Sequence, residues 1–312
     1  MKKLSSKNFD KARKFLFANG RPLDVALFKF HFEDGSPSAV MNELAKYQNE
    51  DGGFGNSLEP DLRTPLSSAL ATSIALREMV NLNVDRENEI LSKTITYLLT
   101  SLDRQHWRWV IAPEGRKDSP HAPWWGADDI LSAFSGCVAN PSSEITGLLL
   151  NYRGLIPEEI LSALLKRMQA YLLETIAADG GSFEMHDLMC YLVFFHSENL
   201  DQLTREEIRP ILISQAERIV DKDRNKWSGY GARPLSLCDN PNSMLYPYLK
   251  ECVNENLDFE IENQSEEGSW MPFWNWGDYN TMHWPMACRE WSSHLTFKTL
   301  LILKNFDRLE RI

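Results

Sequence analysis

The sequence predicts an all-α protein, an (α/α)6 barrel (toroid) of paired helices around a central cavity. Three observations support this prediction: helical periodicity runs through most of the chain, strand alternation is almost missing, and three similar glycine loops each follow a helix. Helical hairpins joined by such loops stack, and a closed stack is a toroid. Twelve helices of about 12 residues with short connections need roughly 250–300 residues. The chain, with 312 residues, is long enough.

Apolar residues recur at three- and four-residue steps in eight stretches, which predicts eight amphipathic helices. These stretches are 24–32, 39–47, 67–82, 90–102, 160–176, 185–195, 208–220 and 291–306. Ser36 and Thr64 each precede a proline, an arrangement typical of a helix start. The acidic segments 157–159 and 204–207 favour the positive end of the helix dipole. The small residues of 67–73 predict an inner, crowded helix.

The repeat-like corner loops lie near 48–55, 179–183 and 264–270, with weaker echoes at 105–107 and 227–230. Each of the three has an acidic residue before glycine and ends in an aromatic residue. Glycine suits such a corner because it tolerates positive φ. We expect the aromatic ring to fill the space between hairpins and the glutamines Gln48 and Gln264 to bond the loop backbone. The prediction is one toroid domain over residues 1–312.

Composition and charge exclude several classes of protein. There are 33 Lys+Arg against 44 Asp+Glu, a formal net charge of -11, and no basic run, which argues against nucleic-acid binding. No apolar run approaches the ~20 residues of a membrane span, and the first residues have no signal-peptide core, so we expect a cytoplasmic protein. The five cysteines form no CxxC pair and are expected to be reduced core thiols.

The segments QNEDGGFG at 48–55 and QSEEGSW at 264–270 resemble the repeat of squalene cyclases and protein prenyltransferases. Its core is Gln, three variable positions, Gly and an aromatic residue, and the resemblance extends over residues 39–306. It implies an (α/α)6 barrel whose inner helices surround a cavity in which isoprenoids are cyclised or transferred. Residues 55–72 are similar to bacterial members of this family for which the resemblance implies a fold but no settled activity.

The catalytic motifs that the resemblance implies are missing. Cyclases of this family use an acidic DxDD cluster, and the nearest feature here is Asp128-Asp129. Adjacent helical residues diverge by about 100°, so one of the two could face a cavity, while a helix N-cap is the simpler interpretation.

The zinc site of prenyltransferases is also broken. Its Asp precedes its Cys, whereas Cys238 comes before Asp239 here, ahead of His283 and His294. Cys238 is therefore interpreted as a buried small apolar residue, and no cofactor or metal is expected. Cations for a diphosphate are few: Arg233, Arg289 and Lys298.

Polar residues follow each corner loop, at the start of the next helix. In a toroid whose inner helices begin at one rim, these residues would meet there and could perform acid–base chemistry. The predicted catalytic residues are Glu59, Asp61, Asp128, Asp278, His283 and His294. The predicted ligand-binding residues are Arg63, Trp124, Trp125, His186, Trp270, Trp274, Trp276, Tyr279, Trp284 and Arg289. Each also has a plainer interpretation as a cap or surface group, and His294 as a core histidine.

Three functions are compatible with this rim. The first is a terpenoid cyclase- or prenyltransferase-like protein that binds an apolar, isoprenoid-like small molecule in the central cavity, with catalysis left open. The second is a carbohydrate-active toroid enzyme, a glycoside hydrolase or lyase, that uses rim carboxylates and Trp platforms. The third is a scaffold that binds a ligand or protein without chemistry.

Overall fold

The computed structural model describes residues 1–177 and 180–311, and this part of the chain is helical with isolated β-bridges but no strand. The all-α prediction is therefore confirmed. Contacts divide the chain into two compact units: unit 1 comprises Met1–Leu44 and Val220–Ile312, and unit 2 comprises Ala45–Ile219. The predicted single toroid domain stays a prediction.

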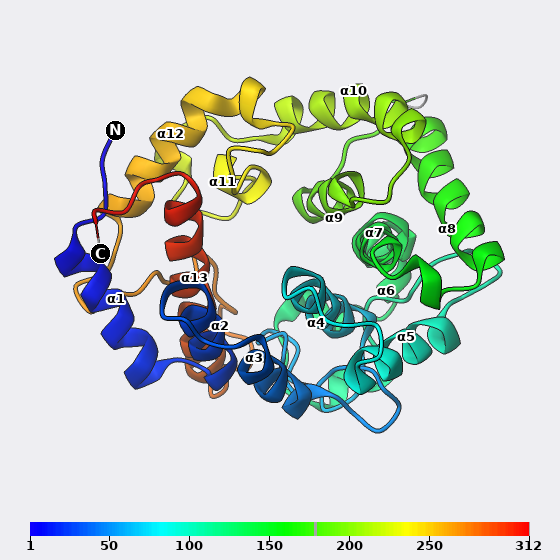
Figure 1. Cartoon of the computed structure of the whole chain (residues 1–312), viewed down its shortest axis with the longest axis horizontal. Helices are drawn as coiled ribbons and strands as arrows, with labels where there is room; N and C mark the ends of the chain where they lie inside the picture. Colours follow the sequence, from blue (N-terminus) through cyan, green and yellow to red (C-terminus); the bar gives the residue numbers. More distant parts are fainter. Residues whose placement is uncertain (178–179, 312) are drawn as a thin grey trace. The chain divides into compact units, whose positions relative to one another are not determined.

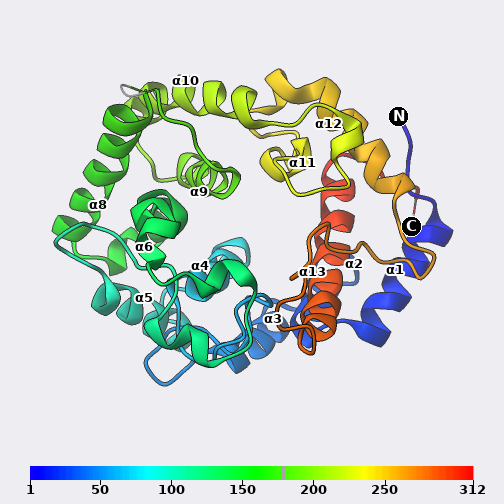
Figure 2. The ribbon, with the colours of Figure 1, turned by 180° about the vertical axis from the view of Figure 1, so that it is seen from behind.

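Unit 2 consists of inner and outer helices. Helix α7 packs against both α4 and α9, while α5, α8 and α10 each pack on one member of this trio (Figures 1 and 2). The helices are α4 (Ala69–Asn81), α5 (Glu89–Ser101), α6 (Ile130–Ala133), α7 (Glu144–Leu150), α8 (Glu158–Ala170), α9 (Met185–His196) and α10 (Gln202–Ile219). Short 3-10 turns lie at Ala45–Tyr47, Glu114–Asp118, Pro123–Gly126, Ser135–Cys137 and Arg153–Leu155, and π turns at Val138–Ser143 and Tyr171–Ala177.

Helix α4 is the crowded inner helix that its small residues predict, since Ala71, Thr72 and Ala75 are buried. The predicted start at Thr64 is wrong. The helix begins at Ala69, and the Ser68 side chain caps it by accepting a hydrogen bond from the Ala71 amide.

Helix α7 has no counterpart among the predicted helices. All of its residues are buried, so it has no amphipathic period for a pattern search to detect.

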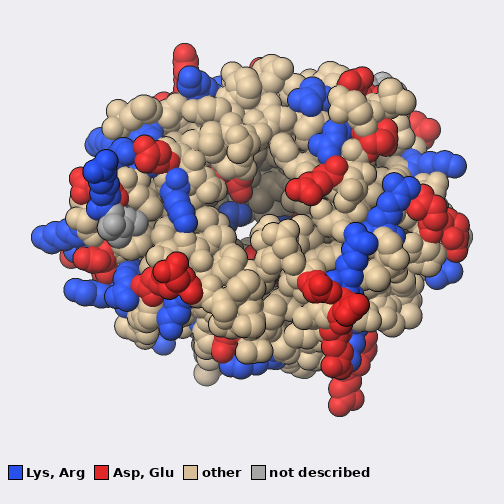
Figure 3. All heavy atoms as spheres, viewed as in Figure 1, with Lys and Arg blue, Asp and Glu red and all other residues tan. Residues whose placement is uncertain are grey.

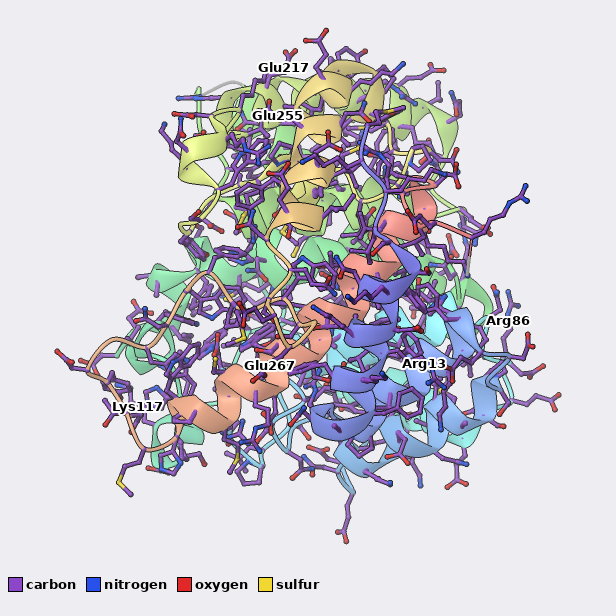
Figure 4. The ribbon with its side chains drawn as sticks, turned by 90° about the vertical axis from the view of Figure 1, so that its left-hand side faces the viewer. Arg13, Arg86, Lys117, Glu217, Glu255 and Glu267 are labelled. Carbon is purple, nitrogen blue, oxygen red and sulfur yellow. The ribbon has the colours of Figure 1, made fainter. Side chains whose placement is uncertain are left out.

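Unit 1 contains α1 (Ser6–Asn19), α2 (Pro22–Phe32), α3 (Pro37–Leu44), α11 (Pro234–Leu237), α12 (Tyr246–Glu262) and α13 (Trp284–Asn305), with a 3-10 turn at Arg224–Lys226. Helix α13 packs against α1 and α2, and α11 packs against α12. Figure 4 shows α1 lying across α13, with Arg13 on α1 and Glu255 on α12. The two ends of the chain are joined by backbone bonds, from the Leu4 amide to the Arg308 carbonyl and from the Glu310 amide to the Leu4 carbonyl.

The corner loop at 48–54 follows the predicted design. The Gln48 amide group donates to the carbonyls of Gly52 and Ile90, both at 3.0 Å, which ties the loop to α5. Gly52 has φ +88°, where an added Cβ would collide with α5. The buried Phe54 donates its backbone N–H to Thr72 Oγ1 of α4 at 3.0 Å. Gln48, Gly52 and Phe54 therefore hold the corner between the inner helix α4 and the outer helix α5.

The corner loop at 264–270 repeats this design in unit 1. The Gln264 side chain donates to the carbonyls of Gly268 and Asn8, both at 2.9 Å. Gly268 has φ +96° and lies against α1. The buried Trp270 donates its backbone N–H to Thr296 Oγ1 of α13 at 3.1 Å. The two corners share their hydrogen bonds position by position, although 216 residues separate Gln48 from Gln264.

Helix α1 takes, beside the last corner, the position that α5 takes beside the first corner. Gln264 bonds the Asn8 carbonyl of α1, as Gln48 bonds the Ile90 carbonyl of α5. Helix α1 therefore serves as the outer helix of the repeat that contains α12, the last corner and α13.

The corner near 179–183 uses a substitute for the missing glutamine. The Gln215 side chain of α10 donates to the Gly181 carbonyl at 3.0 Å and accepts the Phe183 backbone N–H at 3.0 Å. Asp179, which belongs to the predicted loop, lies outside the described residues. A glutamine on the following outer helix can therefore supply the same backbone contact.

Acidic and basic side chains are interspersed over the face seen in Figure 3, which carries no broad basic area. Among residues 1–177 and 180–311, no helix combines the length and apolar character needed to cross a membrane.

Candidate functional site

In unit 2 the structure brings together two segments that carry predicted site residues. The Ala122 amide donates to the Asp61 carbonyl at 2.8 Å, and the Arg63 amide donates to the Pro120 carbonyl at 3.1 Å. Both Glu59 and Asp61 are buried, and Arg63 is half-buried. The loop that holds Glu59 and Asp61 is thus paired with the segment that leads to the Trp124-Trp125 turn. His121, buried in this pairing, was missed because nothing in its local sequence marks it.

The Trp124 to Asp128 segment separates into exposed and buried parts. Trp125 is buried and stacks on Phe134, with ring centroids 5.0 Å apart, whereas Trp124 is 40% exposed. Asp128 is fully exposed, and its hydrogen bond to Lys117 lowers the pKa of its carboxyl. Asp129 caps α6, in agreement with the simpler interpretation of this acidic pair.

The beginning of α9 carries the predicted residue His186. Its Nδ1 lies 2.9 Å from Glu184 Oε2, and Glu184 also caps the helix by accepting the His186 backbone N–H at 2.7 Å. Asp187 follows and is buried. Burial and the neighbouring Glu184 carboxylate raise the pKa of Asp187 to about 6. Unit 2 therefore has a buried carboxyl group that changes charge near neutral pH.

A buried polar cluster joins the three inner helices of unit 2. Arg77 of α4 donates from Nε to Glu144 Oε1 of α7 at 2.9 Å, and Cys190 Sγ of α9 lies 3.5 Å from Glu144 Oε2. Burial raises the pKa of the Cys190 thiol well above its usual value, so this thiol is not an activated nucleophile. Sequence analysis missed the cluster because its members come from three distant segments.

Two of the predicted tryptophans in unit 1 have packing roles. Trp270 fills the corner described above, and its indole N–H donates to the Glu260 carbonyl at 2.8 Å. Trp276 is buried, and its ring centroid lies 5.7 Å from that of the half-buried Trp284. Trp270 and Trp276 therefore present little ring surface to a ligand.

Four further predicted residues lie at or near the beginning of α13. Asp278 and Tyr279 are exposed and His283 is half-buried. Arg289 is exposed and borders a surface hollow of about 460 Å³. The hollow is lined by Asn19, Gly20, Arg21, Met282, Pro285, Met286, Arg289 and Glu290.

In unit 1, the buried Asp24 of α2 lies next to His294 of α13. Arg21 holds the Asp24 carboxylate through two bonds, Nε to Oδ2 at 2.7 Å and Nη2 to Oδ1 at 3.1 Å. His294 Nδ1 lies 3.5 Å from Asp24 Oδ1. Burial opposes ionisation of Asp24, but Arg21 and His294 outweigh it and hold the pKa of the carboxyl well below its usual range. Sequence analysis found His294 and missed Asp24, which looks like an ordinary first-turn acid.

Aromatic rings extend from His294 and form what we call the aromatic wall, Phe273, Trp274 and Trp291. The ring centroids of Trp291 and His294 are 5.9 Å apart. The Trp274 ring packs edge-on against the Trp291 ring, with centroids 5.0 Å apart. Phe273 contacts Trp274 at 4.9 Å. His294 and both indoles are half-buried. The His294 imidazole, with its ionised partner Asp24, therefore lies at one end of the partly accessible aromatic wall.

The cysteine of the broken zinc motif, Cys238, lies in the core. Cys238 is buried, burial raises the pKa of its thiol to about 12, and its Sγ lies 3.6 Å from the Asn240 carbonyl. Within the described ranges 1–177 and 180–311, no three His, Cys, Asp or Glu side chains are grouped so that they could hold a metal ion. No metal chemistry is inferred from these residues.

No protein-family model matches the chain, and no curated protein or solved structure is significantly similar to it. The case for a function therefore depends on the residues themselves. The predicted set divides between the units: Glu59, Asp61, Arg63, Trp124, Trp125, Asp128 and His186 belong to unit 2, and the remaining members belong to unit 1. Of these groups, His294 with Asp24 and the aromatic wall combines an acid–imidazole pair with partly accessible apolar rings.

Proposed function

We propose that the chain closes into an (α/α)6 toroid and binds an apolar, isoprenoid-like small molecule against the aromatic wall beside His294. The matching corners at 48–54 and 264–270 support a repeat of paired helices, of which the toroid is the closed form. The docking of α1 beside the last corner supports it as well, since it leaves the last repeat without an open edge.

The single observation that carries the ligand proposal is the edge-on pair Trp274 and Trp291 next to His294. Indole faces bind apolar chains and stabilise positive charge that develops on them. The side chains of Trp274 and Trp291 are not fully used in packing, unlike those of Trp270 and Trp276. A polyene chain lying on these rings would bring one of its carbons or its polar end to the imidazole.

The chemistry proposed for His294 is proton acceptance. Asp24 and His294 form an acid–imidazole pair in which the carboxylate orients the ring. Because Arg21 holds both carboxylate oxygens, Asp24 stays ionised and keeps its orientation. Proton donation to an alkene, which the cyclase motif supplies in related enzymes, is not part of the proposal.

The carbohydrate alternative has weaker support. It requires two carboxylates facing one another across a sugar, but Glu59 and Asp61 are buried and Asp128 is paired with Lys117. The scaffold alternative makes no use of the Asp24–His294 pair.

The ligand proposal is tested by titrating the protein calorimetrically with farnesol and with farnesene, an alcohol and a hydrocarbon with the same isoprenoid skeleton. We expect both to bind, and Trp274→Ala to weaken both by at least tenfold because it removes half of the edge-on pair.

Tyr248→Ala is the matched control, because Tyr248 is an exposed aromatic residue on α12 outside the wall. Its affinities should equal those of the wild type. Absence of binding to the wild type, or equal affinities in Trp274→Ala, would refute the ligand proposal. A crystal structure in which the two units do not close into one ring would refute the toroid.

A further inference from the structure

We infer that the ligand carries a neutral oxygen, an alcohol or a carbonyl, which accepts a hydrogen bond from the Trp291 indole N–H. This inference rests on the proposed function and adds the class of polar group that the site selects. It makes Trp291 the residue that determines specificity for the polar end of the ligand, whereas Trp274 contributes apolar surface.

The observation behind it is a missing hydrogen bond. Among the described residues, four buried side-chain polar atoms have no hydrogen-bond partner: Trp125 Nε1, Tyr152 Oη, Ser197 Oγ and Trp291 Nε1. A buried donor without an acceptor is unfavourable because it has lost its hydrogen bond to water, so such a group calls for an explanation. Trp291 Nε1 is the one whose ring lies against the imidazole of an acid–imidazole pair.

The Trp274 ring lies beside the ring that carries this donor. Trp274, which meets the Trp291 ring edge-on, belongs to the non-helical segment 271–283, whereas Trp291 is fixed in α13. A ligand oxygen could reach the Trp291 N–H by displacing the Trp274 ring without unwinding a helix. The ligand would then satisfy the donor that the protein leaves without an acceptor.

We infer a neutral oxygen because the nearby cations are either paired with other groups or too far from Trp291 to bind an anion together. Arg21 is bound through two hydrogen bonds to Asp24. Arg233 lies over the Phe273 ring at 3.8 Å and pairs with Glu260 at 3.0 Å. Arg289 is two residues before Trp291 on α13, which turns it about 160° away from Trp291 around the helix axis. Lys298 is seven residues beyond Trp291, about 10 Å along a helix. A diphosphate needs several adjacent cations, whereas a hydroxyl or carbonyl needs one N–H donor.

The experiment compares farnesol, farnesene and farnesyl diphosphate on the wild type and on Trp291→Phe, which keeps an aromatic ring and removes the N–H. We expect Trp291→Phe to weaken farnesol binding by about tenfold and to leave farnesene within twofold, because the hydrocarbon has no oxygen to lose a bond. In the wild type, farnesol should bind more tightly than farnesyl diphosphate.

Tyr152→Phe is the matched control, since it removes another buried donor without a hydrogen-bond partner, in unit 2. It should change neither affinity. Equal effects of Trp291→Phe on farnesol and farnesene, no effect on either, or tighter binding of the diphosphate would overturn the inference. If the wild type bound none of the three, the proposed function would fail and the inference with it.

A second measurement avoids any dependence on the stability of the variant. In wild-type protein labelled with ¹⁵N-tryptophan, farnesol should shift the Trp291 indole N–H resonance downfield, as expected of a new hydrogen bond, and farnesene should not. An unchanged Trp291 resonance at saturating farnesol would contradict the proposed bond.

Discussion

Asp24 and Asp187 occupy the same position in their helices but have opposite ionisation behaviour. Each is the third residue of its helix, α2 or α9, and each is buried, with exposed fractions of 0% and 9%. The helix dipole favours a negative charge at both positions equally. The pKa of Asp24 is nevertheless held well below its usual range, whereas that of Asp187 is raised to about 6.

The difference comes from the residue three positions earlier, which is the N-cap residue in both helices. This residue is the cation Arg21 before Asp24 and the anion Glu184 before Asp187. Burial penalises both carboxylates, and the sign of the neighbouring charge decides which one ionises readily. The charge of the cap residue therefore accounts for the difference: Asp24 stays ionised and orients His294, whereas the pKa of Asp187 is raised to about 6.

The largest expected effect comes from breaking the Asp24 pair. Asp24→Asn should lower the free energy of unfolding at pH 7 by about 3–4 kcal/mol, because it leaves the largely buried Arg21 guanidinium without its anion. Since the pKa of Asp24 is lower in the folded than in the unfolded protein, its contribution is present above about pH 4 and is lost as the pH falls below that. Urea unfolding monitored by circular dichroism at pH 7 measures the change.

Asp128→Asn is the control for this prediction, because Asp128 is a fully exposed acid that pairs with Lys117. No measurable change in stability is expected. Equal stabilities of Asp24→Asn and Asp128→Asn would show that the Asp24 pair contributes little to the folded state.

An opposite effect is expected at Asp187. Asp187→Asn should raise the free energy of unfolding at pH 7 by roughly 2 kcal/mol, because it removes a buried carboxylate whose ionisation the folded protein disfavours. The pKa of Asp187 is higher in the folded protein, so the wild type loses stability as the pH rises from about 4 through 6. Chemical denaturation of both proteins at pH 4, 5, 6 and 7 tests this.

The two curves should coincide near pH 4 and separate progressively up to pH 7. A difference that stayed constant with pH would assign the effect of Asp187→Asn to packing and not to ionisation.

The smallest expected effect concerns the cap itself. Glu184→Gln should lower the pKa of Asp187, since it removes the nearby negative charge, without bringing it to the ordinary value, since burial remains the larger cause. The pKa is measured by following the Asp187 side-chain carboxyl resonance in an NMR titration. A pKa that did not change would mean that burial alone raises it.

The corner loops show how much of the fold the sequence predicts. Gln48 and Gln264 act locally, on a glycine carbonyl four residues ahead, so their spacing alone indicates the bond that forms. Most amphipathic helices were predicted for the same reason, although α1 and α12 match none of the predicted stretches. The role of Gln215 was not, because its loop lies 34 residues before it along the chain.

The candidate site divides in the same way. The sequence by itself determined most of the helices and the glycine corners, because these depend on short-range periodicity and φ preferences. It also supplied the residue types available, including His294 and the tryptophans. Only the tertiary structure decided that Asp24 pairs with His294, that Trp270 packs while Trp274 stays accessible, and that Trp291 lacks an acceptor. Burial and charge pairing depend on segments up to 270 residues apart, and no local pattern encodes which of these segments meet.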